Sequence, residues 1–186
     1  MVQPPEDDWG AWLDAARRKI AIARYHQDLL DRLEYPGAYD YVEIPIQAHL
    51  EGILFSVSAA SDQVARALND AEALRIAPRR ANLSNVLERL ATAEGQGWSP
   101  DLEMLLGELA AWNDEPLIAD ARALRNRAGH SHYDKQSGRY EILIADDGHN
   151  AYQGSRDVLI YCHDLVTHLR ELDGLVERLG NILDRQ

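Results

Sequence analysis

Residues 155–184 have the sequence SRDVLIYCHDLVTHLRELDGLVERLGNILD, in which apolar side chains recur at alternating steps of four and three. The recurring positions are Val158, Cys162, Leu165, Leu169, Leu172, Val176, Leu179 and Leu183. Such steps keep side chains on one side of an α-helix and are typical of packing seams between helices. The pattern predicts a long last helix, from near Ser155 to about Asp184, with an apolar seam along it.

Helical periodicity extends over most of the remaining chain. We expect helices at about residues 8–33, 44–73, 83–94 and 100–112, and a further one that opens at Pro116. The segment Ser99–Asp101 is a strong helix start, because a capping serine is followed by proline and then by an acid. These segments predict an all-α fold, a bundle of long up-and-down helices.

The periodicity changes from helical to alternating between residues 133 and 153. Tyr140, Ile142 and Ile144 alternate with their neighbours, and Asp146–Gly148 supplies a turn. Strict alternation around a turn is typical of paired strands. We therefore expect a small β-hairpin insertion at 133–153, before the last helix.

Length and charge limit the classes of protein to consider. The 186 residues suit a single domain spanning 1–186, with the proline-rich and acidic residues 1–7 expected to be flexible. Because charged or polar residues interrupt the most apolar stretch, 44–60, we expect no membrane span. The single Cys162 suits a reducing cytosol, and the N-terminus lacks the basic and apolar regions of a signal peptide, so we expect a cytoplasmic location. A net charge of −12 argues against a broad nucleic-acid-binding surface but leaves room for a small basic pocket.

The window from Arg122 to Arg139 reverses this acidity. It contains five Lys or Arg residues, one Asp and two His residues, so its formal charge is +4 in a chain of −12. Arginine offers a planar pair of donors to phosphate oxygens, and histidine can move a proton near neutral pH. The composition of this window indicates a site that handles phosphate.

Within that window the segment Arg125–His130 has the sequence RNRAGH. It resembles the R-N-x-x-x-H motif of the HEPN superfamily (higher eukaryotes and prokaryotes nucleotide-binding), which occurs late in a helical bundle. The resemblance implies a dimeric, metal-independent endoribonuclease without a cofactor, possessing a cleft shared by two motifs. His130 would act as general base or acid, Arg125 would hold the phosphate, and Asn126 would orient the histidine or the ribose.

The resemblance also implies a toxin–antitoxin or phage-defence setting, with an antitoxin protein as a partner. We expect further phosphate or substrate contacts from the neighbouring polar residues Arg122, Arg127, His132 and Tyr133. A second register remains open, because Arg127 and His132 also stand five positions apart. The chain shows no P-loop, dinucleotide glycine fingerprint or Glu-x-x-His pair, so we expect neither metal nor cofactor.

Three further expectations complete the interpretation. Glu51 and Asp62 stand eleven residues apart, close to three full turns, so they lie along one polar line that is either a solvated flank or faces the site. The apolar seam and long helices predict a homodimer.

Instead of a ribonuclease, the chain could be a non-catalytic nucleotide- or RNA-binding module or a structural dimerisation domain. Its basic cluster would then be a solvated helix end.

Overall fold

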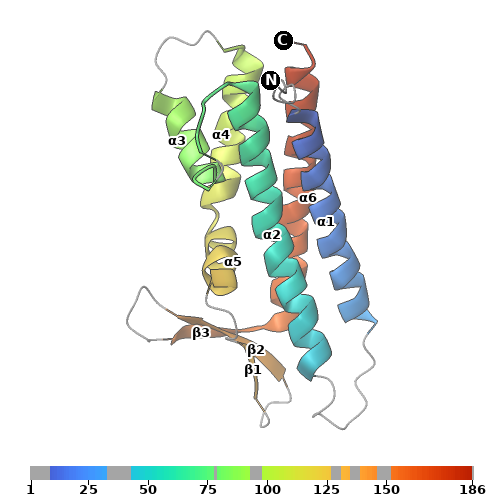
Figure 1. The fold of residues 1–186 in the computed structure, drawn as a ribbon. Helices are drawn as coiled ribbons and strands as arrows, with labels where there is room; N and C mark the ends of the chain where they lie inside the picture. The colour runs from blue at the N-terminus through green and yellow to red at the C-terminus, as the bar shows by residue number, and fades with distance from the viewer. Residues whose placement is uncertain are drawn as a thin grey trace, which may run out of the picture.

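The computed structural model describes residues 9–32, 43–77, 79–92, 98–126, 131–134, 139–145 and 152–185. Within these residues lie six helices (Figure 1): α1 (Trp9–Asp31), α2 (Glu43–Ala71), α3 (Leu83–Thr92), α4 (Pro100–Asp114), α5 (Pro116–Asn126) and α6 (Val158–Leu183). The helical class predicted from the sequence is confirmed. The N-terminal residues 1–7 lie outside the described part of the chain.

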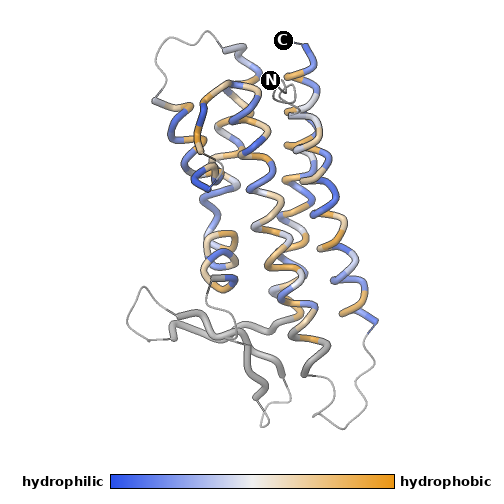
Figure 2. The backbone as a smooth tube through the Cα atoms, in the orientation of Figure 1, coloured by the Kyte–Doolittle hydropathy of each residue, from blue (hydrophilic) through white to orange (hydrophobic). Residues whose placement is uncertain are grey.

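The three long helices α1, α2 and α6 run side by side as the body of the bundle (Figure 1). On the other side of α2, helices α4 and α5 follow each other end to end, and α3 packs against α2 and α4. Polar and apolar residues alternate along the helices (Figure 2), in keeping with one buried and one solvated side to each. None of the described helices has the length and apolar composition that a membrane span requires.

The boundaries of α4 follow from local chemistry. The Ser99 side chain accepts a hydrogen bond from the Leu102 backbone N–H at 3.3 Å, and Pro100 is the first helical residue, which confirms the predicted start. At the other end, Glu115 has φ −55° and ψ 128°, outside the helical region. The ring of Pro116 disfavours a helical conformation in the residue before it, so α4 stops before Glu115 and α5 begins at Pro116.

The predicted seam of α6 packs inside the chain. All of its residues whose burial is described are buried, namely Cys162, Leu165, Leu169, Leu172, Val176, Leu179 and Leu183. They belong to the same core cluster as apolar residues of α1, α2, α4 and α5. The seam is therefore accounted for by packing within one protomer, and it gives no separate reason to expect a dimer.

Helices α1 and α2 approach each other closely at Gly52. A Cβ atom on this residue would lie 2.4 Å from His26 Nε2 of α1, so the imidazole occupies the space that any larger residue would need. The Nδ1 atoms of His26 and His49 lie 3.1 Å apart, at hydrogen-bond distance. The lack of a side chain at Gly52 thus lets a histidine pair bridge the two helices.

Between α5 and α6 the described residues form three strands, β1 (Ser131–Asp134), β2 (Arg139–Ala145) and β3 (Tyr152–Asp157). They pair antiparallel in the order β1-β2-β3 at one end of the bundle (Figure 1). The sequence predicted two strands within 133–153, whereas the pairing runs from Ser131 to Asp157. Because β3 continues to Asp157, the last helix begins at Val158 and not near Ser155 as predicted.

Candidate functional site

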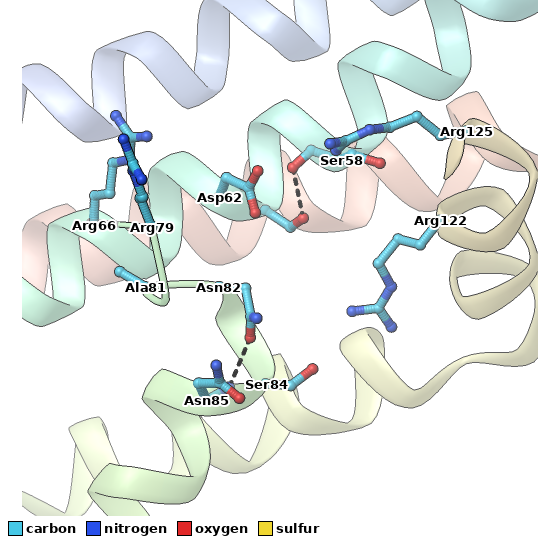
Figure 3. Close-up of a pocket in the computed structure, with 11 residues that line it drawn as sticks. Ser58, Asp62, Arg66, Arg79, Ala81, Asn82, Ser84, Asn85, Arg122 and Arg125 are labelled. Atoms are coloured by element: carbon cyan, nitrogen blue, oxygen red, sulfur yellow. Dashed lines mark hydrogen bonds between the residues drawn. The ribbon is translucent and has the colours of Figure 1, made fainter. Parts of the chain in front are cut away.

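A polar pocket of about 390 Å³ opens between α2, α3 and α5 (Figure 3). Four arginines and one aspartate give it a formal charge of +3, in a chain whose net charge is −12. Most of the other lining side chains are hydroxyls and amides. The lining residues are Ser58, Ser61, Asp62, Arg66, Arg79, Ala81, Asn82, Ser84, Asn85, Arg122 and Arg125.

The α2 wall of the pocket follows from helical spacing. Ser58, Asp62 and Arg66 stand four residues apart, so their side chains follow one another along one side of the helix. Glu51 is exposed and does not line the pocket. Eleven residues of helix, about 16 Å, separate Glu51 from Asp62. Of the two predicted polar residues, the structure thus brings only Asp62 to the motif-bearing helix α5.

Asp62 is half-buried among guanidinium groups. Burial raises the pKa of its carboxyl group above the ordinary value of 3.8, and Arg125, Arg66 and Arg122 act in the opposite direction. The raised pKa shows that desolvation outweighs the attraction of the three arginines. Asp62 is therefore an acceptor group held inside a positively charged pocket.

Arg122 is fixed by the end of α4. Its Nη1 donates to Asn113 Oδ1 at 2.6 Å, and its Nη2 donates to the Asn113 carbonyl oxygen. Asn113 is itself buried and donates to Ser84 Oγ at 3.1 Å, which links the α5 and α3 walls. Burial lowers the pKa of Arg122, whereas the charges of Asp114 and Asp62 raise it. A guanidinium nevertheless stays charged throughout the physiological pH range. With five N–H donors, Arg122 keeps others for a ligand.

Arg125 lies one helical turn after Arg122, and its exposed side chain also lines the pocket. Two predicted site residues of the motif window are therefore together in one cavity with Asp62. Arg127 and His130 lie outside the described residues, and so do the side chains of Asn126, His132 and Tyr133. For the backbone of the last two, β1 pairs His132 with Glu141 and Tyr133 with Tyr140.

The structure adds two arginines that the sequence motif did not indicate, Arg66 on α2 and Arg79 before α3. The guanidinium carbon of Arg66 lies 5.0 Å from the centroid of the Trp12 ring, a cation–π contact with α1. Trp12 Nε1 in turn donates to Asp70 Oδ2 at 2.7 Å. The only sequence signal for Arg79 is the basic segment 75–80, and no motif connects it with α5.

The beginning of α3 forms the third wall. Asn82 caps this helix, because its Oδ1 accepts from the Asn85 backbone N–H at 2.9 Å. Asn82, Ser84 and Asn85 all line the pocket, so the positive end of the α3 dipole lies beside it. Helix N-termini favour bound anions, and here this effect adds to four positive side chains.

Two buried polar atoms of lining residues lack hydrogen-bond partners within the described part of the chain, Ser58 Oγ and Arg66 Nε. A buried donor or acceptor without a partner costs about 1–3 kcal/mol. The same described residues contain no cluster of three His, Cys, Asp or Glu side chains placed to hold a metal ion. The four arginines and the N-terminal end of α3 suit this pocket to the binding of an anion with several oxygens.

No protein-family model matches the chain, and comparisons with curated proteins and with solved structures give no match.

Proposed function

We propose that the protein is a metal-independent endoribonuclease that holds the scissile phosphate in the pocket between α2, α3 and α5. The observation that supports this is the position of Arg122 and Arg125, which come from the motif-bearing helix and line the same positively charged cavity (Figure 3). Arginine pairs bind phosphate oxygens through parallel N–H donors, which gives both affinity and orientation. The RNRAGH segment at 125–130 adds the histidine that such chemistry needs.

In the proposed reaction, the ribose 2′-oxygen attacks the adjacent phosphorus. The new bond joins the 2′-oxygen to phosphorus, and the bond from phosphorus to the 5′-oxygen breaks. His130 accepts the 2′-proton or donates a proton to the leaving 5′-oxygen, and water takes the other role, so that the products are a 2′,3′-cyclic phosphate and a 5′-hydroxyl. Arg125 and Arg122 offset the negative charge that grows on the phosphoryl oxygens. Because Asn113 already holds Arg122, little reorganisation is needed in the transition state.

Cleavage of a labelled RNA in the presence of EDTA tests this proposal. We expect His130→Ala to lower the rate by about 100- to 10,000-fold, the usual contribution of a general acid or base. Arg125→Lys should also be impaired, because lysine keeps the charge but loses the planar fork. His163→Ala is the matched control, since His163 is exposed on α6 and does not line the pocket.

Several outcomes would contradict the mechanism. If His130→Ala and Arg125→Lys cut RNA as the wild type does, these residues are not catalytic. Inactivity of His132→Ala alone would instead assign the chemistry to the second register, Arg127 with His132. Activity that EDTA abolishes and manganese restores would show that the reaction depends on a metal ion.

A second candidate is a module that binds a phosphate-bearing nucleotide or RNA without cutting it. One feature favours it: the described residues lining the pocket include four arginines and Asp62 but no histidine. Arginine forks bind phosphate oxygens without a general acid or base, so these described residues can hold a phosphate whether or not RNA is cut. Nucleotide binding that is lost in Arg125→Gln, together with no cleavage by the wild type, would establish this candidate.

The resemblance to the HEPN superfamily extends the proposal beyond the pocket. On this resemblance we propose that the ribonuclease acts in a toxin–antitoxin or phage-defence system, as a homodimer that an antitoxin protein restrains. The net charge of −12 is compatible with RNA only if contact is limited to a small basic region. A pocket with a formal charge of +3 is a region of that kind.

A further inference from the structure

We propose that the pocket binds two phosphate groups of one ligand at the same time, one on each side of Asp62. Arg66 and Arg79 would bind one phosphate, and Arg122 and Arg125 the other. This inference assigns the substrate class of the proposed ribonuclease. It rests on the proposed function where the ligand is RNA. That class is a nucleoside flanked by two phosphates, present both in an RNA strand and in a free nucleoside 3′,5′-bisphosphate.

The arrangement of the arginines supports two separate binding positions. Figure 3 shows Arg66 and Arg79 at one end of the pocket and Arg122 and Arg125 at the other, with Asp62 between them. The α2 wall from Ser58 to Arg66 spans eight steps along the helix, which is about 12 Å. A volume of about 390 Å³ also lies in the range of pockets that enclose a small organic ligand.

The charge of the pocket also favours two phosphates over one. Its formal charge is +3, from four arginines and one aspartate. A single terminal phosphate has a charge of about −1.5 to −2 at neutral pH, which leaves at least one positive charge without a counterion. The two terminal phosphates of a nucleoside 3′,5′-bisphosphate bring the sum close to zero, whereas two phosphodiesters of an RNA strand, about −1 each, bring it to about +1 in place of about +2 for a single phosphodiester. Because an unpaired charge becomes costly as a ligand excludes water, the doubly phosphorylated ligand fits better.

Each end of the pocket has one arginine whose position is set by the protein. At one end the Arg66 guanidinium lies over Trp12, whose indole N–H is fixed by Asp70. At the other end two hydrogen bonds to Asn113 hold Arg122. Preorganised donors lose less conformational entropy on binding, so both ends are prepared for an anion before the ligand arrives.

Asp62 lies between the two arginine pairs and suits the part of the ligand that joins the phosphates. A carboxylate accepts hydrogen bonds, and the hydroxyls of a ribose donate them. Its negative charge between two positive groups also repels a phosphate from the middle of the pocket. The alternation of positive, negative and positive groups thus matches a ligand with a phosphate, a hydroxyl-bearing sugar and a second phosphate.

Calorimetric titration of the full-length protein with adenosine 3′,5′-bisphosphate, and with the 3′- and 5′-monophosphates, tests the proposal. We expect the bisphosphate to bind about tenfold or more tightly than either monophosphate, as lost charged hydrogen bonds would predict. Arg79→Gln should remove most of this advantage. Arg80→Gln is the matched control, because the neighbouring Arg80 is exposed and does not line the pocket. Equal affinity for all three nucleotides in the wild type would overturn the proposal, and so would identical results for the two variants.

RNA experiments separate the two sources of the ligand. The His130→Ala variant should barely cleave RNA, so the binding of a short RNA oligonucleotide that keeps its 2′-hydroxyls can be titrated in that background in the same way. Tight binding that Arg79→Gln weakens supports RNA as the ligand, whereas binding of the free bisphosphate alone supports a mononucleotide. In the cleavage assay, Arg79→Gln should raise the KM for RNA and Arg80→Gln should not. An absence of cleavage by the wild type would refute the ribonuclease and leave the two-phosphate result standing.

Discussion

Replacement of Gly52 by alanine tests how closely α1 and α2 pack. The added Cβ would lie 2.4 Å from His26 Nε2 and 2.6 Å from both Cδ2 and Cε1. Separations this short are incompatible with van der Waals contact, so the imidazole must rotate away. Since His26 Nδ1 lies 3.1 Å from His49 Nδ1, that rotation also breaks the contact between the two rings.

The expected change in stability is the balance of three contributions. Alanine is more favourable than glycine inside a helix by about 1 kcal/mol. Against this, forcing extra volume into a packed contact costs about 1–3 kcal/mol, and the lost hydrogen bond costs about 0.5–1.5 kcal/mol. We therefore expect Gly52→Ala to lower the free energy of unfolding by about 0.5–3.5 kcal/mol, the gain in propensity included.

Urea unfolding followed by circular dichroism at neutral pH measures this change. Gly107→Ala in α4 and Gly174→Ala in α6 are matched controls, because apart from the neighbouring residues and the backbone of the same helix no heavy atom lies within 4 Å of the added Cβ in either case. Both should gain about 0.5–1 kcal/mol. In a His26→Ala background the obstruction is gone, so Gly52→Ala should then stabilise the protein. A gain from Gly52→Ala in the wild type equal to that of the controls would refute the packing described here.

Four further outcomes are expected. Burial and the neighbouring His49 lower the pKa of His26 from 6.5, so the free energy of unfolding should fall as the pH drops below that value. Urea unfolding at several pH values should show a smaller fall for His26→Gln than for the control His163→Gln, in which an exposed histidine is replaced. Trp12→Phe removes the hydrogen bond to Asp70 and should lower the free energy of unfolding by about 1–2 kcal/mol. Because burial raises the pKa of Asp62, Asp62→Asn should be more stable than the wild type at neutral pH. In urea unfolding at several pH values, this difference in stability should shrink as the pH falls through the raised pKa. The shared cleft of the proposed HEPN-like mechanism requires two protomers, so the mass in solution at micromolar concentration should be that of a dimer, and a monomer would remove this cleft from the mechanism.

The helices could be predicted because their causes are local. The cap at Ser99, the ring of Pro116 and the apolar steps of residues 155–184 act through neighbours within one or two turns. Periodicity was less informative where strand and helix meet, and the structure extends β3 to Asp157, into the segment predicted to be helix.

The partners of a helix face depend on tertiary packing. The seam of α6 has the same spacing whether it packs against another protomer or against the rest of its own chain. Its residues are buried in the core cluster of the same chain, so the seam packs within one protomer. Glu51 and Asp62 likewise occupy one line of α2, yet only Asp62 lies where α3 and α5 cover the helix. Spacing along a helix determines which side chains share a face, and not what that face meets.

The basic window and its motif were visible in the sequence, because arginine and histidine were close together along the chain. The pocket was not, because Arg66 and Arg79 reach it from elements far from α5 in sequence. Charge pairing depends on distance in space, which is set by how the helices cross. The amino-acid sequence by itself therefore determined the helices and the positively charged segment, while the tertiary structure decided which groups that segment would face, namely Asp62 and a second pair of arginines.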